Sequence, residues 1–83
     1  MTEGPFTDML GVQAHVSRLE LTEREKECLI GLAHGHRIDR IADNLGIKSV
    51  TVQLHIDKAK KKLNATTREQ ALFIAMQAGL VTP

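Results

Sequence analysis

The residues best suited to bind a ligand lie in one stretch, from Gly46 to Leu63. At 100° per residue this stretch predicts a helix whose apolar face consists of Val52, Ile56, Ala59 and Leu63. The opposite face carries Val50, Leu54, Asp57 and Lys61, flanked by Gln53 and Lys58. A solvated helix rarely presents valine and leucine just ahead of a lysine cluster unless a partner covers them. The pattern indicates a binding surface, and our hypothesis is that it enters the major groove of DNA.

The outward face contains side chains that can recognise base edges. Apolar side chains contact thymine methyl groups, glutamine bonds adenine through two hydrogen bonds, and aspartate accepts from the cytosine amine. We therefore expect base contacts from Val50, Gln53, Leu54 and Asp57. Two alternatives stay open. Val50 and Leu54 could instead pack against a neighbouring helix, and Asp57 could instead hold Lys61 four residues later.

The lysines of the same stretch are expected to contact phosphates, which supplies affinity and salt dependence but no sequence information. The expected phosphate contacts are Lys48, Ser49, Thr51, Lys58 and Lys61. Lys60 and Lys62 are weaker candidates, and Thr51 could instead cap the helix locally. A lysine run taken alone is usually only a solvated face. The charge distribution favours the polyanion, because residues 48–63 contain five lysines and one aspartate, whereas residues 1–30 contain three basic and six acidic side chains.

The composition limits the class of protein. A chain of 83 residues has room for one small domain, and with no tryptophan or tyrosine and two phenylalanines its core must be aliphatic, which favours packed helices. The single cysteine, Cys28, excludes an internal disulfide. The sequence shows no signal peptide, and its longest apolar stretch, Ala71 to Val81, is well short of the ~20 residues that span a bilayer. We expect a cytoplasmic protein without a membrane partner.

The elements that position the binding stretch are predicted to be helices. A first helix over Thr22–His34 begins with the capping-box spacing of Thr22 and Glu25 and ends before Gly35. A second is predicted over Ile38–Leu45 and a third over Ser49–Leu63. Either Ser49 or Lys48 opens the third helix, and Ser49 is the better N-cap by its side chain. The glycine turn at Gly46 joins these two as in a helix-turn-helix.

A final helix is predicted over Thr67–Ala78, with Asn64 as the terminator of the preceding helix. Its circumference is apolar nearly all round, which one small domain cannot cover. We therefore expect a dimer interface that contains Leu72, Phe73 and Met76. Residues 1–19 form a flexible tail, a linker or a short helix over Thr7–Arg18, and residues 20–83 form the domain.

Catalytic or metal-binding chemistry is not indicated. The spacing of Cys28, His34, His36 and His55 is not that of a zinc site. Glycine-rich phosphate loops and nucleophile motifs are absent, and the glutamates of the first helix suit the positive end of its dipole rather than an acid and base pair. We expect no enzyme activity, no metal, no cofactor and no small-molecule ligand within this chain.

Several motifs together resemble the LuxR-type helix-turn-helix domain, found at the carboxyl end of quorum-sensing activators and many response regulators. They cover roughly Glu20 to Val81 and are LTEREKECL, Ala33-x-Gly35, Ile41-Ala42, Leu45-Gly46-Ile47, Thr51-Val52-x-x-His55 and Lys62-Leu63. EKECL and the closing Arg68-x-Gln70-Ala71 with Gly79-Leu80 are similar to the quorum-sensing branch. The resemblance implies an all-α, four-helix domain whose third helix reads double-stranded DNA and whose fourth forms homodimers that bind an inverted repeat.

The chain departs from the family pattern at four positions. Arg37 stands where serine or threonine is usual, Arg40 where glutamate is usual, Lys48 where serine is usual, and Gly31 where a bulky residue is common. The second helix is therefore capped differently and is more basic. Binding strength and site preference are not transferred from the family.

Two other functions fit the same residues. The chain could be a stand-alone interaction module that pairs through Thr67–Ala78 with a full-length regulator and inhibits it, as a heterodimer. A sigma-factor-like promoter reader shares the opening Leu21-Thr22-x-Arg24-Glu25. The sensing domain that normally precedes this module is missing, so the chain is either a stand-alone member of the family or an excised piece whose residues 1–19 are linker.

Overall fold

The computed structural model describes residues 20–82, which contain four helices and no strand. They are α2 (Glu23–Ala33), α3 (Ile38–Leu45), α4 (Ser49–Lys62) and α5 (Arg68–Gln77). The all-α helix-turn-helix prediction is confirmed. The helix expected over Thr7–Arg18, with the rest of residues 1–19, lies outside the described residues.

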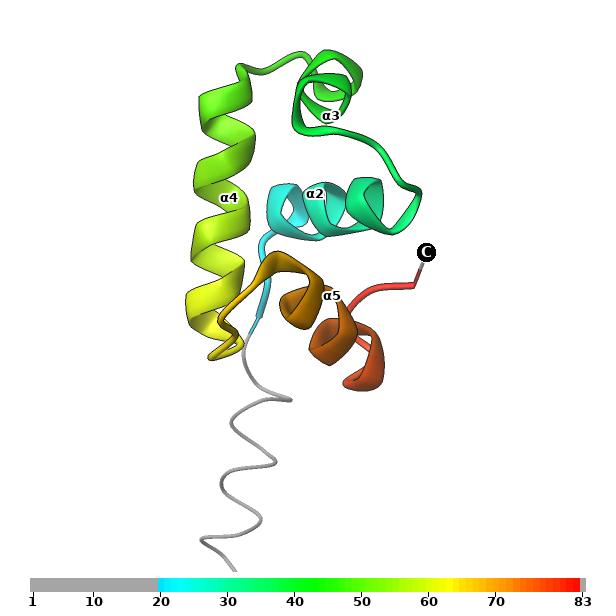
Figure 1. Ribbon diagram of the computed structural model, residues 1–83, viewed down its shortest axis with the longest axis vertical. Helices are drawn as coiled ribbons and strands as arrows, with labels where there is room; N and C mark the ends of the chain where they lie inside the picture. The colour runs from blue at the N-terminus through cyan, green and yellow to red at the C-terminus, as the bar shows by residue number, and fades with distance from the viewer. Residues whose placement is uncertain (1–19, 83) are drawn as a thin grey trace, which may run out of the picture.

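Helix α4 runs along one side of the domain, and the other helices pack against its inner side (Figure 1). Helices α2 and α5 lie beside its lower two thirds, while α3 crosses near its amino-terminal end. The chain enters α4 through a short turn, in which Gly46 ends α3 with φ of 70° and the N–H of Ile47 donates to the carbonyl of Ala42 at 3.0 Å. The left-handed φ suits glycine because that conformation crowds a Cβ.

The helix bounds differ from the predicted ones by single residues. Thr22 and Thr67 lie outside α2 and α5 as N-caps, and His34, Leu63 and Ala78 follow α2, α4 and α5 as C-caps. Gly35 and Gly79 come next with positive φ, and so does Asn64, at 55°. The differences concern only whether a capping residue, which is half in the helix, is counted as part of it.

Of the two residues predicted to open α4, the less favoured one is the N-cap. Lys48, not Ser49, is the N-cap of α4, because its carbonyl accepts the first helical hydrogen bond, from Val52 at 3.0 Å. The half-buried Ile47 packs on the core just before Lys48, and the first helical residue is Ser49. The Lys48 side chain makes no capping hydrogen bond.

The core consists of two clusters of buried side chains. One joins α2, the second half of α4 and α5, and consists of Leu21, Leu29, Ala59, Leu63, Ala71, Ala75 and Val81. The other joins α2 to the helix-turn-helix pair and consists of Cys28, Ile41, Ala42, Val52 and Ile56. The predicted apolar face of α4 is therefore confirmed, and it serves both clusters. In α2, Cys28 and Leu29 are buried, whereas Leu32 and Ala33 are only half-buried.

Candidate nucleic-acid interface

The face of α4 that points away from the core carries the side chains expected to contact bases. Val50 is 71% exposed and Leu54 is 50% exposed, whereas Val52 and Ile56 on the inner face are fully buried. Val50 and Leu54 are not covered by any helix of residues 20–82, so the alternative in which they pack against a neighbouring helix finds no support in this part of the chain. Two apolar side chains of α4 are thus exposed to solvent on its outward face.

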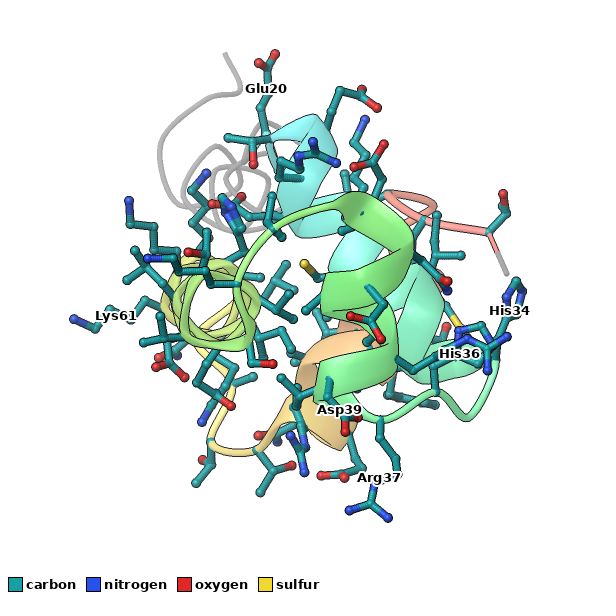
Figure 2. All side chains as sticks on the ribbon, turned by 90° about the horizontal axis from the view of Figure 1, so that it is seen from above. Glu20, His34, His36, Arg37, Asp39 and Lys61 are labelled. Carbon is teal, nitrogen blue, oxygen red and sulfur yellow. The ribbon has the colours of Figure 1, made fainter. Side chains whose placement is uncertain are left out.

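The expected phosphate-binding residues lie around this apolar pair. Lys48, Ser49, Lys58 and Lys61 are exposed, while Thr51 is half-buried. Viewed from above, Lys61 points away from the rest of the domain (Figure 2). The second half of the face is hollowed by a depression of about 470 Å³, lined by Leu54, Asp57, Lys58, Lys60, Lys61, Ala65 and Thr66. The structure brings the predicted basic and apolar side chains together on one surface.

Asp57 does not hold Lys61. Its Oδ1 instead accepts a hydrogen bond from Nε2 of Gln53, one turn earlier, at 3.1 Å. No ion pair within residues 20–82 includes Asp57. A glutamine and an aspartate four residues apart are a favourable helical pair, and both side chains belong to the predicted base-reading set.

Lys62 is directed into the domain, which removes it from the candidates for phosphate contact. Its Nζ donates to Oε1 of Glu25 at 2.8 Å and to the carbonyl of Glu20 at 3.1 Å. Glu25 is only 1% exposed, and its Oε1 also accepts from the N–H of Thr22 in the capping box. The pair ties the end of α4 to the start of α2, so Glu25 is more than a partner of the helix dipole.

The surroundings of Glu25 favour its ionised form. Burial of the carboxyl group raises its pKa, but the hydrogen bonds from Lys62 and from the backbone of Thr22, with the positive charges of Lys62 and His55, outweigh burial. The pKa of Glu25 therefore lies below its ordinary value of 4.5. His55 itself is half-buried.

Helix α5 has a second exposed apolar face, which faces away from the core. Phe73 is 60% exposed and Met76 is 40% exposed, while Leu72 beside them is half-buried. The core side of the helix is made of Ala71 and Ala75, which are fully buried. Of the three residues expected at a dimer interface, Phe73 and Met76 are therefore accessible, whereas Leu72 packs partly against the core.

A groove that the sequence did not reveal lies between the end of α2 and the starts of α3, α4 and α5. It measures about 580 Å³, and its lining includes Leu32, Arg37, Asp39, Ser49, Arg68 and Leu72. Figure 2 shows Arg37, Asp39 and His36 along this side of the domain. Arg37 and Arg68 are 31 residues apart in the sequence, so no local spacing could have brought them together.

Residues 20–82 contain neither a metal-binding cluster nor a membrane-spanning helix. No group of three or more histidine, cysteine, aspartate or glutamate side chains is placed to hold a metal ion. None of the helices in this part of the chain has the length and apolar character needed to cross a lipid bilayer.

Comparison with known proteins gives a consistent family. Residues 19–75 match the family described as bacterial regulatory proteins, luxR family. The chain is 37% identical over 71 residues to the uncharacterized transcriptional regulatory protein YxjL of Bacillus subtilis, covering 83% of this chain and 33% of the relative. It is 39% identical over 66 residues to the transcriptional activator protein VanR of Vibrio anguillarum, covering 80% of this chain and 28% of the relative. It is 35% identical over 72 residues to the transcriptional activator protein LuxR of Aliivibrio fischeri, an alignment that covers 87% of this chain and 29% of the relative. The chain thus spans about a third of the length of these relatives.

Proposed function

The chain belongs to the luxR family of bacterial regulatory proteins, which are DNA-binding transcription regulators and not enzymes, and on this premise we propose that it binds an inverted-repeat promoter site as a homodimer. In this proposal α4 lies in the major groove. Val50, Gln53, Leu54 and Asp57 form the base-reading face, and Lys48, Ser49, Thr51, Lys58 and Lys61 bind the flanking phosphates.

The observation that carries the proposal is the outward face of α4. Val50 and Leu54 are exposed beside Lys58 and Lys61, on the side opposite the buried Val52 and Ile56. Exposed apolar side chains suit thymine methyl groups, and flanking lysines suit phosphates on either side of a groove. A helix of 14 residues is roughly 21 Å long, enough to follow a major groove about 12 Å wide.

The homodimer part of the proposal is supported by the exposed face of α5. Phe73 and Met76 would be covered by the same face of a second copy, because a two-fold axis pairs a patch with itself. A two-fold dimer presents two copies of α4 to two half-sites, which predicts an inverted repeat.

Salt dependence of DNA binding tests the first part. The target is a fluorescent duplex recovered by selection from random DNA, and binding is followed by anisotropy from low to high salt. Lys58→Ala/Lys61→Ala should bind at least about tenfold more weakly and reduce the slope of log K against log salt by about 2. The control, Arg24→Ala/Lys26→Ala, removes two charges from α2, where each is paired with a glutamate. Absence of binding that weakens with salt contradicts the proposed DNA binding, and affinity that is unchanged in Lys58→Ala/Lys61→Ala contradicts the phosphate contacts proposed for these two lysines.

Sedimentation of a matched pair of variants tests the dimer. Phe73→Asp should convert the dimer to a monomer, whereas Leu54→Asp makes the same kind of change on α4 and should leave the sedimentation coefficient unchanged. The order of the two variants should reverse when binding to DNA with a single half-site is measured. There Leu54→Asp should weaken binding more than Phe73→Asp. A wild-type monomer at all concentrations, bound to DNA or free, contradicts the homodimer.

A second candidate function is supported by the same exposed α5 face. A chain that pairs through Leu72, Phe73 and Met76 with a full-length relative could withhold that relative from its promoter as a heterodimer. Addition of the chain to a full-length luxR-family regulator would then lower promoter occupancy, and Lys58→Ala/Lys61→Ala would inhibit as well as the wild type. Loss of inhibition in that variant would favour direct DNA binding.

The cellular setting is the last part of the proposal. The EKECL motif and the closing Arg68-x-Gln70-Ala71 support the quorum-sensing branch of the family. A regulator of promoters works where the chromosome is, so the proposal places this chain in the cytoplasm. Chromosomal enrichment at sites with the selected half-site sequence would test both its location and its role.

A further inference from the structure

We propose that Asp57 is a positioning residue, which orients the Gln53 carboxamide so that it selects adenine over guanine. The inference deepens the proposed function and rests on it, because it assigns the specificity of the same α4 face. It also accounts for a carboxylate on a surface that is otherwise suited to a polyanion.

The hydrogen bond between the two side chains decides which end of the amide faces the carboxylate. Nε2 of Gln53 lies 3.1 Å from Oδ1 of Asp57. An ionised aspartate only accepts hydrogen bonds, so the nitrogen and not the oxygen of the amide must point toward it. For a glutamine, whose oxygen and nitrogen are nearly identical in shape, such a partner is what defines the orientation.

The orientation leaves a particular set of groups for the base. Nε2 has two hydrogen atoms, and one is used by Asp57. The remaining N–H and the free Oε1 form one donor beside one acceptor. Adenine presents the complementary pair in the major groove, the N7 acceptor and the N6 donor. Guanine presents two acceptors, N7 and O6, which would require two donors and would place O6 against Oε1.

Asp57 should act on affinity and on specificity in opposite directions. Its charge lies next to the phosphate-binding lysines, Lys58 and Lys61, and repels the DNA backbone. It therefore weakens binding to every sequence while it improves discrimination at one position. A direct contact from Asp57 to a cytosine amine would behave differently, because its removal would weaken binding and lose a cytosine preference.

The test is selection from random DNA followed by anisotropy on single-base variants of the half-site, with wild-type protein and with Asp57→Asn. Asparagine keeps the size of the side chain but can donate as well as accept, so the Gln53 amide is free to turn over. We expect the adenine-to-guanine affinity ratio at one position to fall on the order of tenfold, with equal or tighter binding overall. Gln53→Ala should lose the same preference, and Gln53→Ala/Asp57→Asn should lose no more.

The control and the contrary outcomes separate this inference from the proposed function. Glu27→Gln removes the same charge from α2 and should leave the base preference unchanged. If wild-type protein shows salt-dependent, sequence-specific binding but Asp57→Asn keeps its adenine preference, the positioning role is overturned and the proposed function stands. If Asp57→Asn instead loses both DNA affinity and a preference for cytosine, Asp57 is a base contact and not a positioning residue. No salt-dependent binding by wild-type protein would overturn both.

Discussion

The four helices divide into two pairs that begin in different ways. Helices α2 and α5 start at threonines whose hydroxyl groups accept a hydrogen bond from the third helical residue, at 3.1 Å for Thr22 and 3.0 Å for Thr67. The helix-turn-helix pair, α3 and α4, starts at Arg37 and Lys48, neither of which makes a side-chain capping bond. A cation at this end of a helix also opposes the dipole.

The difference suggests what each pair is for. A threonine cap stabilises a helix by about 1 kcal/mol, so α2 and α5 are built as a stable framework. In α3 and α4 the same positions carry exposed charges, which are unfavourable for the free helix and suit a phosphate backbone. Local rules are commonly broken where a surface serves a ligand.

The framework also joins the two pairs. Glu25, the third helical residue of α2, completes the capping box and binds Lys62 at the end of α4. Cys28, one turn further along α2, lies in the cluster with Ile41 and Val52 of the helix-turn-helix pair. Changes at these contacts should therefore affect the whole domain, whereas a change at the exposed Lys48 should affect mainly DNA binding.

The largest expected effect is on the reactivity of Cys28. Burial of the thiol, with the negative charge of Glu27 nearby, raises its pKa from 9.0 to about 11. At pH 8 this lowers the thiolate fraction about a hundredfold relative to an ordinary cysteine. Alkylation by iodoacetamide, followed by mass spectrometry, should be slower than in denatured protein by at least that factor. Rapid alkylation in the native state would show that α2 and the helix-turn-helix pair separate readily.

The second-largest effect is expected from loss of the ion pair between Lys62 and Glu25. Lys62→Met leaves the Glu25 carboxylate buried without its partner and should lower the free energy of unfolding by about 1–3 kcal/mol in urea denaturation, less than for a fully buried pair because Lys62 is partly exposed. Lys61→Met, next to it but directed outward, should change stability little. Equal losses in the two variants would contradict the distinction between the inward and the outward lysine.

The pH dependence of stability provides a check on the same pair. The pKa of Glu25 is lowered by folding, so its contribution is fully present above the ordinary value of 4.5 and is lost as the pH falls through the lower pKa of the folded state. Wild-type protein should lose more stability on acidification through this range than Lys62→Met. Parallel curves would mean that the pair does not favour the ionised carboxyl group.

Removal of the framework caps should have a smaller effect. Thr67→Ala should destabilise the domain by about 1 kcal/mol, since the N–H of Gln70 loses its acceptor. Arg37→Ala removes no capping bond and should leave the melting temperature almost unchanged. Thermal denaturation followed by circular dichroism would show the difference, and a similar loss in both variants would remove the contrast between the two helix pairs.

The smallest expected effect has the opposite sign. Lys48→Ser places a capping hydroxyl at the start of α4 and should stabilise the domain by about 0.5–1 kcal/mol. The same change removes a proposed phosphate contact and should weaken DNA binding severalfold, with a salt slope lower by about 1. A variant that is both more stable and equally tight in anisotropy would show that Lys48 does not bind phosphate.

Much of the fold could be predicted because local rules specify it. The apolar spacing from Ile38 to Leu45 and the glycine after it gave the observed bounds of α3, and the capping box at Thr22 forms as its spacing predicts. The two faces of α4 were also predicted, since side chains four residues apart lie on one side of a helix whatever surrounds it. The contacts of these faces with DNA stay predictions.

Contacts between helices could not be read in this way. The sequence by itself determined four helices, their turns and the outward face of α4, because these depend on neighbours within one or two turns. Only the tertiary structure decided that Lys62 turns inward while Lys61 turns outward, because the partner of Lys62 is Glu25, on another helix. It also placed Arg37 and Arg68 on one groove, because helix packing brings together residues that are distant in the sequence. Within α4, side-chain rotamers direct Asp57 to Gln53 rather than to Lys61, a choice that the spacing of four residues on either side leaves open.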